Sequence, residues 1–166
     1  MRFAQKSVSV GFTVIELMVV VAIMAIIAGI AAPNLRDWVI RNNIASITTD
    51  RLAAINFARA EAVSSRRNVS LCAQGSCGSS TNWSGAIAVV QGACSTTATV
   101  IKTFDASYPG YDVTSSVNCI TFLPAGTTTA VGANISASFS GNTAFNRMIC
   151  ISTLGRPRLI SGNSCS

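Results

Sequence analysis

The sequence predicts an α+β protein in which a long N-terminal helix is followed by a domain of β-strands. Two observations predict the helix. Residues 12–32 are almost all Val, Ile, Ala, Met or Leu, and apolar residues recur at helical spacing as far as about residue 64. The strands are predicted by a change beyond residue 68 to Ser, Thr, Gly and β-branched residues, almost without charge. A chain of 166 residues has room for one compact domain and an extended anchor.

The apolar run is long enough to cross the ~30 Å hydrocarbon core of a bilayer as a helix. Arg2 and Lys6 precede it without a neighbouring acid, so the N-terminus is expected to stay cytoplasmic while the rest of the chain is exported. Glu16 is the ionised group within the run, and a carboxylate in lipid needs a partner or a task. A secretory signal cleaved near Gly29-Ile30-Ala31 is the alternative, but signal h-regions are shorter and lack such a charge.

The stretch Gly11-Phe12-Thr13-Val14-Ile15-Glu16-Leu17 resembles the N-terminus of type IV pilins and type II secretion pseudopilins. The resemblance implies that a prepilin peptidase cuts after Gly11 and methylates Phe12, and that Glu16 serves filament assembly. Physically, Glu16 of one subunit can pair with the new ammonium at Phe12 of its neighbour, which sets the register of the bundle. We therefore expect a leader peptide at 1–11 and a transmembrane, filament-core helix at 12–33.

Residues 34–65 are predicted to continue this helix with one apolar face that packs on the globular domain. The stripe consists of Ile44, Ile47, Ile55, Ala58 and Ala62, flanked by Leu52 and Val63. The opposite, polar face is expected to carry Asp50, Arg51, Asn56, Arg59 and Ser65.

The end of this helix reads Asn56-Phe57-Ala58-Arg59-Ala60-Glu61-Ala62-Val63. This A-R-x-E-A segment, followed by Arg66-Arg67 and a first strand, resembles minor pilins and pseudopilins of the FimT/FimU/GspH group. We interpret Arg59 and Glu61 as surface charges, and Arg66 and Arg67 as cations that complement the helix dipole rather than as a ligand site.

Residues 66–166 are expected to form a GspH/FimT-like β domain, either a sandwich or a strongly bent antiparallel sheet, with the helix covering one face. Turn signals such as Tyr108-Pro109-Gly110 separate the candidate strands. These are Val69 to Ala73, Ala86 to Gln91, Thr99 to Phe104, Val117 to Leu123, Ile135 to Ser140, Arg147 to Ser152 and Arg158 to Ser161. The aromatic residues Trp83, Phe104, Phe122, Phe139 and Phe145 are interpreted as core residues rather than as a platform for stacked bases.

Six cysteines in an exported chain indicate disulfides. The sequence has no histidine and no CxxC pair, which argues against a metal site, a cofactor and a His-based enzyme; Lys102 would be the only base left, without a supporting motif. Six cysteines allow fifteen pairings, so the connectivity stays open. The pairing that we favour joins Cys72 to Cys77, Cys94 to Cys119 and Cys150 to Cys165.

The candidate site lies near the C-terminus, because Val113 to Ser166 contains Arg147, Arg156 and Arg158 but no acid. Gly155 permits a tight turn, and an extended segment places Arg156 and Arg158 on one face, roughly 6–7 Å apart. Arginine suits phosphate through its planar fork of donors. A hairpin turn with solvated arginines is the alternative.

The G-R-x-R pattern of Gly155, Arg156 and Arg158 resembles the DNA-binding minor pilins of natural transformation; Arg147 is added on grounds of charge alone. The sequence thus favours a minor type IV pilin that binds extracellular DNA non-specifically. The alternative is a structural minor pilin or type II pseudopilin that primes filament assembly. Expected partners are DNA, other pilins, the prepilin peptidase and the inner membrane before assembly, with the globular domain periplasmic and, in the pilus, extracellular.

Overall fold

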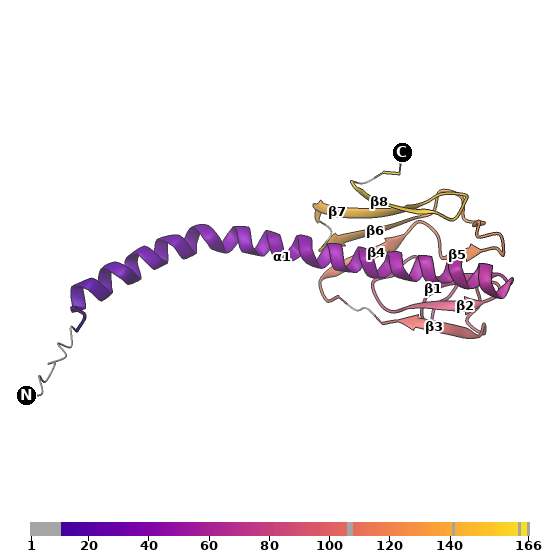
Figure 1. The fold of residues 1–166 in the computed structure, drawn as a ribbon, viewed down its shortest axis with the longest axis horizontal. Coiled ribbons are helices and arrows are strands. Elements are labelled where there is room, and N and C mark those ends of the chain that lie inside the picture. Colours follow the sequence, from indigo (N-terminus) through magenta and orange to yellow (C-terminus); the bar gives the residue numbers. More distant parts are fainter. Residues whose placement is uncertain (1–10, 106–107, 141, 163, 166) are drawn as a thin grey trace, which may run out of the picture. The chain divides into compact units, whose positions relative to one another are not determined.

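The computed structural model describes residues 11–105, 108–140, 142–162 and 164–165, so the predicted leader, apart from Gly11, lies outside it. Within these residues the chain forms one helix and eight strands (Figure 1). The elements are α1 (Val14–Ser65), β1 (Val69–Ala73), β2 (Ile87–Gln91), β3 (Val100–Phe104), β4 (Tyr111–Ser115), β5 (Cys119–Phe122), β6 (Asn134–Phe139), β7 (Asn142–Ile151) and β8 (Pro157–Ser161). The chain divides into two compact units, Met1–Val39 and Ile40–Ser166.

Helix α1 begins at Val14 because Thr13 caps its first turn. The Thr13 hydroxyl accepts a hydrogen bond from the backbone N–H of Glu16 at 3.3 Å, as side-chain oxygens at helix N-caps commonly do. A window of 18 residues in this helix has a mean hydropathy of 2.8, and none of that window is buried within the chain. By length and composition, α1 can therefore cross a membrane.

The second half of α1 carries the core of the Ile40–Ser166 unit. The predicted stripe is confirmed, since Ile44, Ile47, Ile55, Ala58 and Ala62 are all fully buried. They belong to one apolar cluster with residues from the strands, among them Leu71, Ile120, Phe122, Ile135, Ile149 and Ile151. The helix ends where Arg66 adopts a left-handed conformation (φ 54°), a common way to terminate a helix.

The strands form two antiparallel four-stranded sheets, which together bear out the predicted architecture. The first sheet has the order β3-β2-β1-β5 and the second the order β4-β6-β7-β8 (Figure 1). Both sheets contribute to the cluster that contains the α1 stripe, so the helix and the inner faces of both sheets share a single core. Trp83 and Phe122 are fully buried in it, and Phe104, Phe139 and Phe145 pack against its margin, as predicted for the aromatic residues.

Three disulfides join the six cysteines, and they are the pairs favoured above: Cys72–Cys77, Cys94–Cys119 and Cys150–Cys165. Two of them lie on the outer face of the first sheet, where Cys72 and Cys77 form a small second cluster with Ala88 and Val90. Every residue of β1 is buried, because the main core covers one face of the strand and the second cluster covers the other.

Strand β4 was missed by the sequence analysis. Its sequence, Tyr-Asp-Val-Thr-Ser, alternates correctly but has only Val113 as an aliphatic residue. The strand forms because Val113 and Ser115 point inward and because β6 supplies a full ladder of partners, from Phe139 to Ile135. Strand β7 also begins earlier than predicted, at Asn142 rather than at Arg147.

Arg51 corrects the prediction of a wholly polar outer face for α1. Its side chain is 1% exposed, and its Nη2 donates to the carbonyl oxygens of Trp83 at 3.0 Å and Gly85 at 2.7 Å. Burial lowers the pKa of Arg51, while the neighbouring carboxylate of Asp50 opposes that shift. A guanidinium so fixed ties the segment at residues 83–85 to the helix.

We predict that replacing Arg51 by Met lowers the free energy of unfolding by about 2–4 kcal/mol, because the buried carbonyl group of Trp83 and the partly buried one of Gly85 lose a charged donor. Arg66→Met, at an exposed position, is the control and should change stability by no more than about 0.5 kcal/mol. Guanidinium titration followed by the fluorescence of Trp83, with Trp38 replaced by Phe, measures both. Equal stabilities of the two variants would contradict the structural role of Arg51.

Candidate functional site

The predicted arginine segment forms the loop between β7 and β8 and the first half of β8. The loop is closed by backbone hydrogen bonds from Gly155 N to Ser152 O at 2.8 Å and from Ser152 N to Arg156 O at 3.1 Å. Gly155 has φ +69°, so it adopts the left-handed conformation expected of a turn glycine. The loop is thus a defined turn.

Gly155 is also required by a close approach of a second loop. A Cβ atom at Gly155 would lie 2.2 Å from the carbonyl oxygen of Gly126 and 3.3 Å from Nε of Arg59. The same Gly126 oxygen accepts a hydrogen bond from Arg59 Nε at 2.9 Å. Arg59 was interpreted from the sequence as a surface charge, but it is half-buried and its side chain is bound to this carbonyl group. The A-R-x-E-A and G-R-x-R segments therefore both contact the carbonyl group of Gly126.

Arg156 directly precedes β8 and Arg158 is the second residue of this strand, which is the edge strand of the second sheet; both arginines are exposed. Arg158 is opposite Cys150 in the ladder between β7 and β8. The Cys150–Cys165 disulfide closes a loop of sequence separation 15 and starts from the position opposite Arg158. The two guanidinium groups therefore project from an edge that is held by a turn and a disulfide.

Arg147, the third predicted arginine, lies on the other face of the β7–β8 ribbon. Side chains alternate along a strand, so Arg147 shares the inner face with the buried residues Ile149 and Ile151, while Cys150 and its ladder partner Arg158 take the outer face. The structure thus separates Arg147 from the other two arginines. Sequence charge alone grouped them because it carries no information on the face of each residue.

Arg147 instead neighbours an arginine that the sequence analysis did not single out. The guanidinium carbon of Arg41, in α1, lies 5.0 Å from the centre of the Phe145 ring. Arg41, Phe145 and Arg147 line the same small recess. Phe145 and Arg147 are two positions apart in β7, so the alternation of a strand predicts that they share a face. No local pattern in the sequence indicates that Arg41 lies beside them.

The residues predicted to serve processing and assembly lie at the start of the described chain. Gly11 and Phe12 precede the helix, and the Phe12 side chain is 83% exposed. Glu16 is exposed and sits in the first turn of α1. The order Thr-x-x-Glu is that of a capping box, in which an acid three residues after the cap favours the helix N-terminus.

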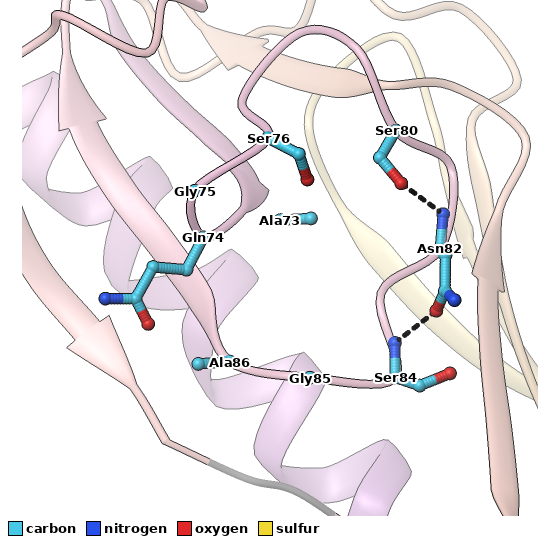
Figure 2. A pocket seen from close by; sticks show the side chains of 9 residues that line it. All are labelled: Ala73, Gln74, Gly75, Ser76, Ser80, Asn82, Ser84, Gly85 and Ala86. Carbon is cyan, nitrogen blue, oxygen red and sulfur yellow. Dashed lines mark hydrogen bonds between the residues drawn. The ribbon is translucent and has the colours of Figure 1, made fainter.

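A larger hollow of about 640 Å³ lies between the loop after β1 and the segment before β2 (Figure 2). Its lining consists of Ala73, Gln74, Gly75, Ser76, Ser80, Asn82, Ser84, Gly85 and Ala86. Two of the polar side chains stabilise their own loop, because Ser80 Oγ accepts from Asn82 N at 3.1 Å and Asn82 Oδ1 from Ser84 N at 3.0 Å (Figure 2). The lining contains no ionisable side chain, and within the described part of the chain no group of His, Cys, Asp or Glu residues could hold a metal ion.

We predict that Gly155→Ala destabilises the protein more than Gly132→Ala. Both glycines have nearly the same φ, +69° and +68°, so both substitutions incur about 1–2 kcal/mol of backbone strain. Only Gly155 has an obstructing atom, and displacing the Gly126 carbonyl should add about 1–3 kcal/mol. Chemical unfolding of the two variants tests this difference, and equal losses would show that the close approach is relaxed without cost.

Comparison with known proteins identifies the family. Residues 48–155 match the family described as type II transport protein GspH. Two crystal structures of the type IV minor pilin FimU of Pseudomonas aeruginosa PAO1 superpose with TM-scores of 0.63 and 0.56, each at 25% sequence identity. The first alignment covers 72% of this chain and 90% of FimU, and the second 66% and 86%.

A shorter similarity links the chain to a major subunit. The type IV major fimbrial protein FimA of Dichelobacter nodosus is 42% identical over 45 residues, which are 27% of this chain and 29% of FimA. The chain therefore spans less than a third of the length of that curated relative. From the family match and the fold together, the chain belongs to the GspH family and is a type IV minor pilin of the FimT/FimU/GspH type.

Proposed function

We propose that this minor pilin binds DNA without sequence preference, through Arg156 and Arg158, and takes part in DNA uptake for natural transformation. The observation that carries the proposal is the presentation of two exposed guanidinium groups on a rigid sheet edge, in a stretch from Val113 to Ser166 without any acid. Two residues of extended chain separate neighbouring arginines by roughly 6–7 Å, close to the spacing of phosphates along a strand.

The side chains at the β8 edge indicate how DNA would be bound. It presents cations but no helix that could enter the major groove, and the nearby aromatic side chains pack on the core. Contacts are therefore to phosphates, which position DNA without reading its sequence. A single subunit binds weakly, and several subunits along one filament gain affinity through their high effective concentration.

A second candidate function is a structural one, favoured by the likeness to FimU. On this alternative, the chain primes or joins a filament and its arginines remain solvated. The two functions differ in one measurable property, which is binding of DNA by the arginine edge.

We predict that replacing both Arg156 and Arg158 by Gln weakens duplex binding roughly tenfold or more at low salt and flattens the plot of log K against log salt by about two units. Fluorescence anisotropy with full-length protein in nonionic detergent provides the measurement. Arg66→Gln combined with Arg67→Gln, which removes the same charge from exposed residues elsewhere, is the control. Identical binding by wild type and the Arg156/Arg158 variant would favour the structural function.

We also propose that residues 1–11 are a leader peptide that is cut after Gly11. Residues 12–33 then form the transmembrane and filament-core segment, and residues 34–65 continue the helix into the domain at 66–166. In the filament, Glu16 pairs with the methylated N-terminus of a neighbouring subunit. The exposed, non-helical position of Phe12 supports access by a peptidase. Mass spectrometry should find an N-methylated Phe12, and Glu16→Ala should leave the protein folded but absent from filaments. An N-terminus near Ala32 would instead indicate ordinary signal cleavage.

A further inference from the structure

A small recess lies between α1 and the inner side of the β7–β8 ribbon, away from Arg156 and Arg158. It has a volume of about 140 Å³ and is lined by Arg41, Ala144, Phe145, Asn146, Arg147 and Ser161. Arg41 comes from α1, whereas Arg147 and Ser161 are direct partners in the ladder between β7 and β8. The recess therefore brings two arginines from distant parts of the chain to one cavity.

Arg41 is exposed, and its guanidinium contacts an aromatic ring of β7. Its guanidinium carbon lies 5.0 Å from the centre of the Phe145 ring, within the range of a cation–π contact. An arginine over a ring keeps its N–H donors at the rim of the guanidinium plane, where they can bind an anion. Ser161, which also lines the recess, adds a hydroxyl donor.

The described lining of the recess contains two arginines and no carboxylate side chain. Asp37 lies one turn before Arg41 on the same helix and is exposed. Asp112 in β4 alternates with the inward-pointing Val113, so it belongs to the outer face of the sheet, away from Arg147.

We propose that this recess binds a phosphodiester group of nucleic acid, as a second phosphate subsite on the ribbon face opposite to Arg156 and Arg158. The proposal rests on the DNA binding proposed above and adds to it a place and residues that the G-R-x-R segment does not contain. Two guanidinium groups offer several donors to the tetrahedral oxygens of a phosphate, which is the geometry that arginine serves best. Because β8 is an edge strand, one nucleic acid at this edge can contact the recess on one face of the ribbon and Arg156 and Arg158 on the other.

The test measures the salt dependence of binding for four full-length proteins in nonionic detergent, using a short duplex and fluorescence anisotropy. Besides wild type, these carry Arg41→Gln with Arg147→Gln, Arg156→Gln with Arg158→Gln, or all four changes. Arg66→Gln with Arg67→Gln again controls for net charge. We expect each site variant to reduce the slope of log K against log salt by about two units and the quadruple variant to abolish binding.

A further variant, Ser161→Glu, keeps the contact between Arg41 and Phe145 but places a carboxylate in the recess. Ser161→Glu should weaken DNA binding to the same extent as loss of the two arginines. Because this variant retains both arginines, agreement between the two results would argue against misfolding as the cause. Thermal unfolding of each variant is measured alongside.

The outcomes separate this inference from the proposed function. If the Arg41/Arg147 and Ser161→Glu variants bind DNA like wild type while the Arg156/Arg158 variant does not, the recess is not a phosphate subsite and the proposed function stands. If the reverse holds, the recess is the principal site and the hairpin assignment fails. DNA binding like wild type, combined with exclusion of the Arg41/Arg147 variant from filaments, would assign the recess to a carboxylate of a neighbouring pilin and overturn the inference.

Discussion

Burial of one apolar stripe on the second half of α1 is the constraint on which the domain depends. The stripe packs against the inner faces of two separate sheets, so neither sheet has a core without the helix. Strand β1 leads directly out of the helix after Arg66 and is central in the first sheet, with β2 and β5 on its two sides. The rest of the domain is arranged around this helix–strand unit.

The same helix also controls the candidate site through a single polar contact. The Gly126 carbonyl oxygen accepts a hydrogen bond from Arg59 and lies against Gly155, so the end of α1, the loop after β5 and the turn before β8 are in mutual contact. A second bond, from Thr128 N to Thr153 O at 3.1 Å, joins the two loops. The exposed arginines that follow Gly155 therefore begin from a rigid turn, which reduces the conformational entropy lost when they bind a ligand.

The larger hollow lacks ionisable groups, and its polar side chains largely hold their own loops. Lys102, the one lysine beyond residue 11, lies with its ammonium nitrogen 4.8 Å from the centres of both the Phe57 and Phe104 rings, within the range of cation–π contacts. Two pairs of exposed arginines lie at the end of α1 (Arg66 and Arg67) and at the β8 edge (Arg156 and Arg158).

The sequence by itself determined the elements whose signals are local. The apolar stripe from Ile44 to Ala62, the turn glycine at 155 and the exposed pair Arg156 and Arg158 all follow from spacing within one short segment. The three disulfide pairs agree with the favoured pairing, although six cysteines do not define it. Strand β4 could not be predicted from the sequence, because it has one aliphatic residue and forms mainly through its backbone pairing with β6.

Only the tertiary structure decided which distant groups meet. Arg51 is buried because the carbonyl groups of Trp83 and Gly85, more than thirty residues away, converge on its guanidinium. Arg147 faces Arg41 rather than Arg158 because the register of β7 with β8 fixes its side of the ribbon, and because packing of α1 on the second sheet brings Phe145 under Arg41. Periodicity specifies which residues share a face, whereas sheet register and helix packing specify what that face meets.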